Sequence, residues 1–205
     1  HRRRGRTKVA DGAFHSLWKT ATYTLGVRDG MLGIVNPNYS FIELTHVGLE
    51  HISYTQVGDD VYFSSRSSSG IVRSNWQIDP WGTRTPENTW LSPVVNPTAT
   101  LGEIGGKTIG PPPLATSIAY FNGRIYMAHE DTLWATELYL YNYVDKTKNF
   151  IRFTSDITGL GVVDDGIFVG TEAGVDFLSG PFGAMKRTPV ADAGVIPGSM
   201  IQVPA

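Results

Sequence analysis

The sequence predicts an all-β fold of short antiparallel sheets, and three features support this prediction. Runs of Val, Ile, Tyr, Phe and Thr recur along the chain and are bounded by Gly, Asp and Asn. No window keeps helical i, i+3, i+4 spacing without interruption by Gly, Pro or a β-branched residue. The 205 residues include 23 Gly and 12 Pro, which favours a fold with many turns.

The clearest hairpin lies in the stretch AYFNGRIYMAH. Ser117–Phe121 and residues 124–128 are strand-like and flank Asn122-Gly123. Asn-Gly is the preferred pair for a type I′ turn, because both central positions need positive φ. A third strand is expected over residues 132–136, so this part of the chain predicts a three-stranded meander.

The same hairpin pattern recurs along the chain. In each copy an apolar run reaches an Asp, Asn or Gly turn and returns as a strand such as VYFSS, IYMAH or IFVGT. The other turns are expected at Asp29-Gly30, at residues 58–60 and at Asp165-Gly166, with a further turn at Ala173-Gly174. Successive copies are 30, 63 and 43 residues apart, counted between Asp29, Asp59, Asn122 and Asp165.

The longest gap contains a Pro- and Gly-rich stretch, residues 79–113, which is expected to be a loop insertion without secondary structure. Without it the spacing approaches the ~40–50 residues of a propeller blade. The sequence therefore predicts one propeller-like all-β domain over residues 1–205, with a basic N-terminal arm at residues 1–8. A β-sandwich is the alternative, since its turns also recur at short intervals.

Charge and composition narrow the classes of partner. The net charge is −2, so nucleic acid is not an expected partner, and there is no Cys to form a disulfide or thiolate site. No apolar run approaches the ~20 residues of a membrane span. The basic N-terminus lacks both an initiator Met and an apolar signal region, so a processed product or an internal piece of a longer chain is expected.

No motif in the chain predicts catalysis, a metal or a cofactor. The pairs Asp59-Asp60 and Asp164-Asp165 fall in predicted turns, where Asp accepts backbone hydrogen bonds. No zinc-ligand spacing and no nucleophile elbow occur. LGEIGGKT resembles a phosphate-binding loop near Lys107, but no strand–loop–helix context is predicted around it.

Aromatic and basic residues are the candidates for an interface with other proteins, because Trp, Tyr and Arg dominate binding hot spots. Tyr139, Tyr141 and Tyr143 alternate in ELYLYNYVD, which predicts a strand with all three side chains on one face. Packing between blades is the alternative role for this stripe. The full candidate set is Arg2, Arg3, Arg4, Trp76, Trp81, Trp90, Tyr139, Tyr141 and Tyr143.

Several motifs together resemble a family of propeller-like virion proteins from the tail or tail hub of tailed bacteriophages. They are HSLW at 15–18, PWG at 80–82, NGRIY at 122–126, LWATE at 133–137 and DDGIFVGT at 164–171. The resemblance spans most of the chain. It implies a non-enzymatic structural component of the virion that contacts neighbouring tail proteins in a symmetric assembly.

Two other functions are open at this point. Exposed aromatic residues such as Trp81, Trp90 and Tyr141 would suit a module that binds a host-surface glycan. A propeller glycosidase would need two carboxylates facing each other across a cleft, with Glu130 and Glu137 as the candidates.

Overall fold

The computed structural model describes residues 12–82, 102–104 and 107–200, and all regular structure in these residues is β-strand. In this part of the chain there is no helix that has the length and apolar character to cross a membrane. The chain divides into two compact units, residues 1–51 and 52–205, each of which is considered by itself.

The first unit contains one antiparallel sheet in the order β1-β2-β3-β4. Its strands are β1 (Phe14–Lys19), β2 (Thr24–Arg28), β3 (Met31–Val35) and β4 (Phe41–His46). Leu25, Val27, Leu32 and Ile34 are buried on the two central strands. The predicted turn at Asp29-Gly30 is present, and both residues have positive φ, 52° and 84°.

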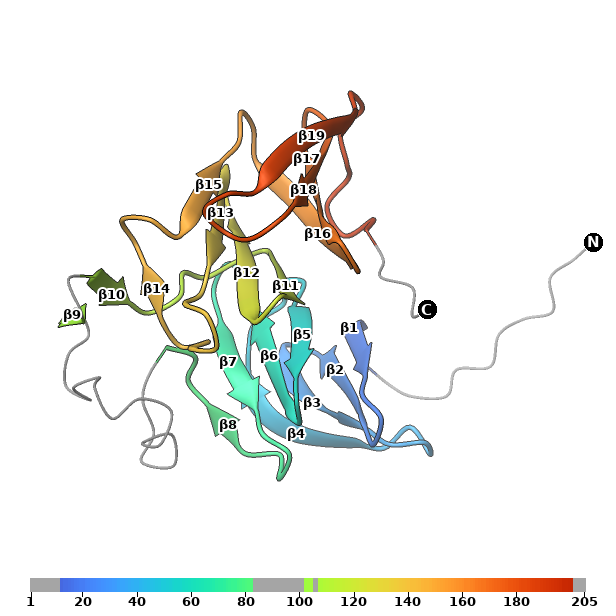
Figure 1. Cartoon of the computed structure of the whole chain (residues 1–205). Helices are drawn as coiled ribbons and strands as arrows, with labels where there is room; N and C mark the ends of the chain where they lie inside the picture. The colour runs from blue at the N-terminus through green and yellow to red at the C-terminus, as the bar shows by residue number, and fades with distance from the viewer. Residues whose placement is uncertain (1–11, 83–101, 105–106, 201–205) are drawn as a thin grey trace, which may run out of the picture. The chain divides into compact units, whose positions relative to one another are not determined.

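The second unit contains three four-stranded antiparallel sheets and one smaller sheet (Figure 1). The first is β5 (Ser53–Val57), β6 (Asp60–Ser64), β7 (Ser69–Val72) and β8 (Ile78–Asp79). The second is β11 (Ser117–Phe121), β12 (Arg124–His129), β13 (Thr132–Ala135) and β15 (Phe150–Arg152). The third is β16 (Ile157–Val163), β17 (Gly166–Thr171), β18 (Val175–Ser179) and β19 (Lys186–Ala191).

A tight turn joins the first two strands of each of these three sheets. Asn122 and Gly123 have φ of 48° and 75°, as a type I′ turn requires. The third turn consists of Asp164 and Asp165, and Gly166 already begins β17, so the predicted turn lies one residue earlier than expected. In the first unit, the Asp29-Gly30 turn joins the second and third strands of its sheet instead of the first and second. It therefore lies one strand later in its sheet than the other turns do, which explains why only 30 residues separate Asp29 from Asp59.

The small sheet corrects the prediction that residues 79–113 lack secondary structure. Its order is β14-β10-β9, with β9 (Gly102–Ile104), β10 (Lys107–Gly110) and β14 (Val144–Asp145). Strands β9 and β10 are antiparallel, and Gly110 pairs with Val144. Lys107 therefore begins a strand and not a helix, which removes the context that a phosphate-binding loop needs.

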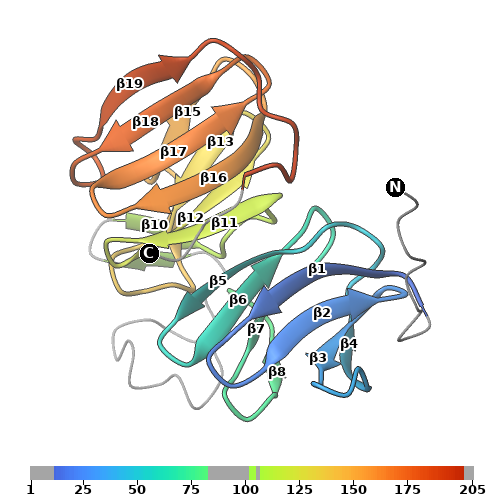
Figure 2. The same cartoon turned by 90° about the vertical axis from the view of Figure 1, so that its right-hand side faces the viewer.

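Sheets of the second unit pack face to face through β12, which is buried on both sides. Ile125 and Met127 point into a core shared with the first sheet, including Tyr62 and Ile71. Tyr126 points into a second core, shared with the third sheet. This period-2 alternation places the middle sheet between its two neighbours, and the first strands β5, β11 and β16 lie next to one another (Figure 2).

Hydroxyl groups on one first strand accept backbone N–H groups from the next. On β5, Ser53 Oγ accepts from Ile118 N at 3.0 Å and Thr55 Oγ1 accepts from Tyr120 N at 2.9 Å. On β11, Ser117 Oγ accepts from Leu160 N at 3.2 Å. The strands β11 and β16 are edge strands, so these backbone N–H groups have no partner within their own sheet. The hydroxyl groups accept them instead and hold neighbouring sheets in register.

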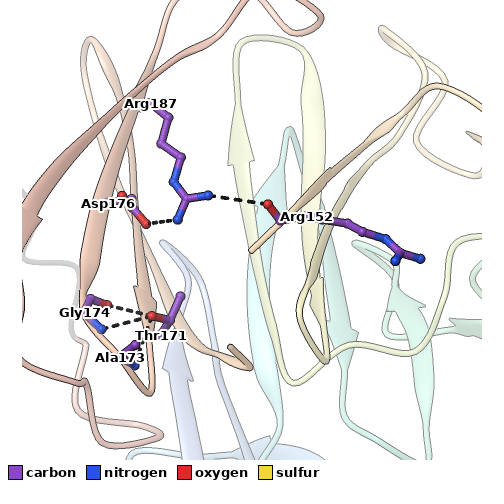
Figure 3. A network of polar contacts seen from close by, with 6 residues as sticks. All are labelled: Arg152, Thr171, Ala173, Gly174, Asp176 and Arg187. Atoms are coloured by element: carbon purple, nitrogen blue, oxygen red, sulfur yellow. Dashed lines mark hydrogen bonds and ion pairs between the residues drawn. The ribbon is translucent and has the colours of Figure 1, made fainter. Parts of the chain in front are cut away.

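A polar network joins the second and third sheets at their outer strands (Figure 3). Arg187 on β19 donates to Asp176 Oδ2 at 2.7 Å and to the carbonyl of Arg152 at 3.5 Å. Below it, Thr171 Oγ1 accepts the N–H groups of Ala173 and Gly174, which closes the predicted Ala173-Gly174 turn.

Candidate interaction surface

The tyrosine-rich segment after β13 forms turns, so the prediction that it is a strand is wrong. Leu140 N donates to Glu137 O, and Tyr143 N donates to Leu140 O, which closes two successive turns. Tyr139 has a φ of 58°. A left-handed residue interrupts the alternation of side chains, so Tyr139, Tyr141 and Tyr143 do not share one face.

These turns place Leu138 and Tyr139 at the surface beside the Asn122-Gly123 turn. Leu138 is 48% exposed and Tyr139 is 64% exposed. The backbone N–H of Tyr139 donates to Gly123 O at 2.8 Å. A Cβ atom at Gly123 would lie 2.8 Å from Tyr139 Cε1 and 2.9 Å from Leu138 Cδ1, so both side chains rest on bare backbone. We call Leu138, Tyr139 and the Asn122-Gly123 turn the Tyr139 surface.

An aromatic cluster supports this segment from within. The Tyr141 ring meets Tyr62 and Tyr120 edge to face, with centroids 6.1 Å and 6.0 Å apart. The indole N–H of Trp81 donates to Tyr141 O at 2.8 Å. Partial burial, with a hydrogen bond to Tyr120, raises the pKa of Tyr141 to about 12, so its phenol stays neutral near pH 7.

Arg124 stabilises the same segment from the other side. Its guanidinium donates to the carbonyl of Thr136, and it lies over the Phe182 ring, 5.1 Å from the centroid. Thr136 Oγ1 in turn accepts from Ile125 N at 3.0 Å. The chain that enters the turns is thus fixed to β12 by its backbone and its side chain, which limits the entropy that Tyr139 would lose on binding.

The structure places the other predicted interface residues differently. Arg2, Arg3, Arg4 and Trp90 lie outside the described residues. Trp76 is 42% exposed on the turn before β8, separate from the Tyr139 surface in sequence and sheet. Trp81 is buried in the core between the first two sheets. Tyr141 and Tyr143 are half-buried, so Tyr139 alone of the three tyrosines presents most of its side chain to solvent.

Several of the acidic residues make structural contacts with neighbouring side chains. Arg73 bridges Asp60 and Asp79, with 2.6 Å to each carboxylate. Asp60 is the first residue of β6, so it lies just after the turn in which it was predicted and forms an ion pair instead. Glu130 lies in the turn before β13, and Glu137 follows the other end of that strand, where it accepts from Asn149 Nδ2 at 3.0 Å. Because the two glutamates lie at opposite ends of β13, they do not face each other. In a glycosidase the two carboxylates would have to do so.

Within residues 12–82, 102–104 and 107–200 no group of three or more His, Asp or Glu side chains is arranged to hold a metal ion. His15 Nδ1 is hydrogen-bonded to Ser16 Oγ, and His129 Nδ1, on an exposed residue, is hydrogen-bonded to Leu114 O.

Sequence reasoning missed Leu138, Tyr62, Tyr120 and Phe182. Leu138 falls inside the expected tyrosine strand, whereas the structure places it in a turn, where its side chain is 48% exposed. The rings of Tyr62 and Tyr120 come together with Tyr141 from three separate segments, and no local pattern indicates such a cluster. Phe182 lies in the turn between β18 and β19, where it packs on Tyr126.

Comparison with known proteins shows the fold at low sequence identity. No protein-family model matches the chain, and no curated protein matches it. The structure of the Pan2 WD40 domain of Neurospora crassa is similar, with a TM-score of 0.55 and 10% identity, covering 88% of this chain and 52% of that chain. PorZ, a bacterial surface component of the type-IX secretion system of Porphyromonas gingivalis, has a TM-score of 0.42 and 13% identity, covering 92% of this chain and 29% of that chain.

The chain therefore has an all-β fold of the β-propeller class, as the sequence predicts, and it spans about half the length of the Pan2 chain. The likeness to Pan2 and the run of four-stranded sheets support the propeller over the sandwich. No comparison indicates a bacteriophage tail protein, so that part of the resemblance stays a prediction.

Proposed function

We propose that this protein is a non-enzymatic assembly module that binds another protein through the Tyr139 surface. The observation that supports this most is the exposure of Leu138 and Tyr139 on a turn fixed by hydrogen bonds at both ends. A rigid Tyr beside an apolar side chain suits a protein hot spot, because little conformational freedom is lost on binding.

The more specific form of the proposal is a structural component of a bacteriophage virion, in the tail or tail hub. It is supported by the motif resemblance at residues 15–18, 80–82 and 164–171. A stack of sheets stabilised by its own cores can present loops to neighbouring tail proteins without conformational change. Such a component acts mechanically and is located in the virion.

A photo-cross-linker tests both forms of the proposal. p-Benzoylphenylalanine replaces Tyr139 in a chain that is assembled into phage particles, and a matched variant carries it at the exposed Arg66. The proposal expects a cross-link to another virion protein from position 139 and much less from position 66. Equal yields from both positions would contradict the Tyr139 surface as the interface, and absence of the chain from purified particles would contradict the virion role.

Glycan binding is the second candidate, because an aromatic ring that is 64% exposed can stack on a sugar. A glycan array separates the two candidates. The assembly module binds no glycan, whereas a receptor-binding module binds one and loses it in Tyr139→Ala.

A further inference from the structure

The turn between β7 and β8 holds an aromatic residue in a conformation that aromatic residues rarely adopt. Arg73 N donates to Gln77 O, and Trp76 N donates to Arg73 O, both at 2.9 Å. Trp76 has a φ of 68° and is 42% exposed. A left-handed backbone is unfavourable for a bulky side chain, whereas Gly adopts it without strain. The turn therefore presents an indole at a position that Gly would occupy more easily.

Tyr139 combines the same features in the neighbouring sheet. It follows β13, the third strand of the middle sheet, as Trp76 follows β7, the third strand of the sheet β5-β6-β7-β8. Its φ is 58°, and it is 64% exposed. The connection between β18 and β19 in the last sheet has Gly180 and Gly183 in the left-handed region instead. Such a connection does not require an aromatic residue, and strained residues of this kind are typical of binding sites.

The two aromatic residues lie at one edge of the second unit. Two hydroxyl bonds between β5 and β11 follow the same order along both strands, so these strands run parallel. Each ends in a tight turn, and the two turns therefore project in one direction. In each sheet the end of the third strand pairs near the start of the second, so Trp76 and Tyr139 are at that same edge. Sheets that pack face to face lie beside this edge and do not cover it.

The end of this edge at Trp76 is acidic. Arg73, which begins the turn, pairs with both Asp60 and Asp79 at 2.6 Å, so one guanidinium faces two carboxylates. Asp59, in the adjacent tight turn, is exposed and adds a third carboxylate. A cation from a partner suits this end, because it can lie over the indole face and pair with an exposed carboxylate.

The aromatic cluster continues the edge from Asp60 to the Tyr139 surface. Burial, and then the Asp60 carboxylate, raise the pKa of Tyr62, so the acidic group lies within electrostatic reach of this ring. Tyr62 contacts the half-buried ring of Tyr141. Leu138 and Tyr139 are exposed just before Tyr141 in the chain. The edge therefore changes from acidic at one end to apolar at the other.

The charges near the apolar end favour one orientation of a partner. The exposed charged residues that follow the Tyr139 surface in the chain, before β15, are both cations, Lys146 and Lys148. They disfavour a further cation at this end, so a basic group of a partner is directed towards Trp76.

We propose that the edge from Trp76 to Tyr139 binds an extended segment of a partner protein, with a Lys or Arg on Trp76 and an apolar residue on Leu138 and Tyr139. This inference rests on the proposed function, because the Tyr139 surface is one end of the site. Packed sheets are about 10 Å apart, and an extended chain advances about 3.3 Å per residue. The basic and the apolar residue of the partner are therefore roughly three to four residues apart.

NMR of the full chain labelled with nitrogen-15 detects even weak binding of such a segment. The probes are short Gly- and Ser-rich peptides that contain one Arg and one Leu at different separations. The indole N–H signal of Trp76, identified among the five Trp by its loss in Trp76→Gly, is expected to shift most at a separation of roughly three to four residues. The signal of the buried Trp81 is expected to stay unchanged, and replacing the peptide's Arg with Gln is expected to abolish the shift.

Trp76→Gly distinguishes a binding role from a structural one. Gly relieves the left-handed strain, so the urea midpoint is expected to stay the same or rise, while peptide binding weakens roughly tenfold. Asp59→Lys is expected to weaken binding as well. Glu172→Lys makes the same change in the exposed turn between β17 and β18, at the opposite edge, and is expected to have no effect. A lower urea midpoint with unchanged binding in Trp76→Gly would overturn the inference.

This inference and the proposed function fail separately. Peptide binding that Tyr139→Ala weakens and Trp76→Gly leaves unchanged would overturn the extended site and keep the Tyr139 surface. If no peptide shifts the Trp76 signal at millimolar concentration, or if an oligosaccharide shifts it and no peptide does, the extended site is also overturned. The cross-link from position 139 then decides on the proposed function alone.

Discussion

The guanidinium of Arg187 lies over the ring of Phe153, 4.4 Å from its centroid, and so joins two neighbouring sheets by a single side chain. Arg187 is on β19, the outer strand of the last sheet, and Phe153 follows β15, the outer strand of the middle sheet. The same guanidinium pairs with Asp176, whose side chain is 11% exposed. The pair with Asp176 holds Arg187 within its own sheet, and Figure 3 shows the same guanidinium directed at the carbonyl of Arg152 in the middle sheet. With the stacking on Phe153, these contacts make Arg187 a clasp between the outer strands of the two sheets.

Replacing Arg187 with Met is expected to lower the free energy of unfolding by about 1–3 kcal/mol. Met keeps part of the packing on Phe153 but leaves the Asp176 carboxylate buried without its cation. The double variant Arg187→Met, Asp176→Asn is expected to recover part of the loss, because no buried charge then remains. Urea unfolding measures both, and a loss no larger than that of Arg66→Met, at an exposed position, would argue against the clasp.

The second prediction concerns the hydroxyl of Thr55, which joins the first strands β5 and β11. Thr55→Val keeps the shape of the side chain but leaves the N–H of Tyr120 without its acceptor. A buried donor that loses its partner costs about 1–3 kcal/mol, so the urea midpoint is expected to fall. Thr154→Val makes the same chemical change at an exposed position, and equal effects of the two substitutions would contradict the role of the hydroxyl.

Most of the fold is predictable from the sequence because it depends on local chemistry. Asn122-Gly123 and Asp29-Gly30 specify tight turns through their tolerance of positive φ, and the flanking β-branched and aromatic residues specify strands. The hairpin β9-β10 and the strand β14 escaped prediction. Their pairing joins Gly110 to Val144, and no short window contains the information for so distant a contact.

The candidate site was predictable only in part, for the same reason. Tyr139, one of the predicted interface residues, is 64% exposed, and its role in binding stays a prediction. Its neighbours were wrong, because period-2 spacing predicts a strand unless a residue adopts positive φ, as Tyr139 does. Trp81 was expected at the surface of a loop, yet its indole N–H reaches Tyr141 O, 60 residues away, and its ring is buried.

Gly123 offers a third prediction, which links stability to the Tyr139 surface. Gly123→Ala meets two costs: a positive φ of 75° and a Cβ only 2.8 Å from the Tyr139 ring. Gly58→Ala is the matched control, since its φ is 62° and its Cβ would meet nothing within 4 Å. Both are expected to lose about 1–2 kcal/mol of unfolding free energy from the left-handed backbone. Only Gly123→Ala is expected to displace the side chain at position 139, and so to reduce the yield of the cross-link formed from that position. An unchanged cross-linking yield in Gly123→Ala would show that the turn does not position the ring.

His51 provides the last prediction, a dependence of the first unit on pH. Partial burial, and then the nearby charge of His15, lower the pKa of His51 below its usual value near 6.5. The folded chain therefore binds fewer protons than the unfolded chain as the pH falls below about 6.5, so stability is present above that pH and is lost below it. His51→Gln is expected to reduce the difference between urea midpoints at pH 7.5 and pH 5.5. His129→Gln, in the second unit, serves as the control, and an equal reduction in both variants would mean that His51 is not the responsible group.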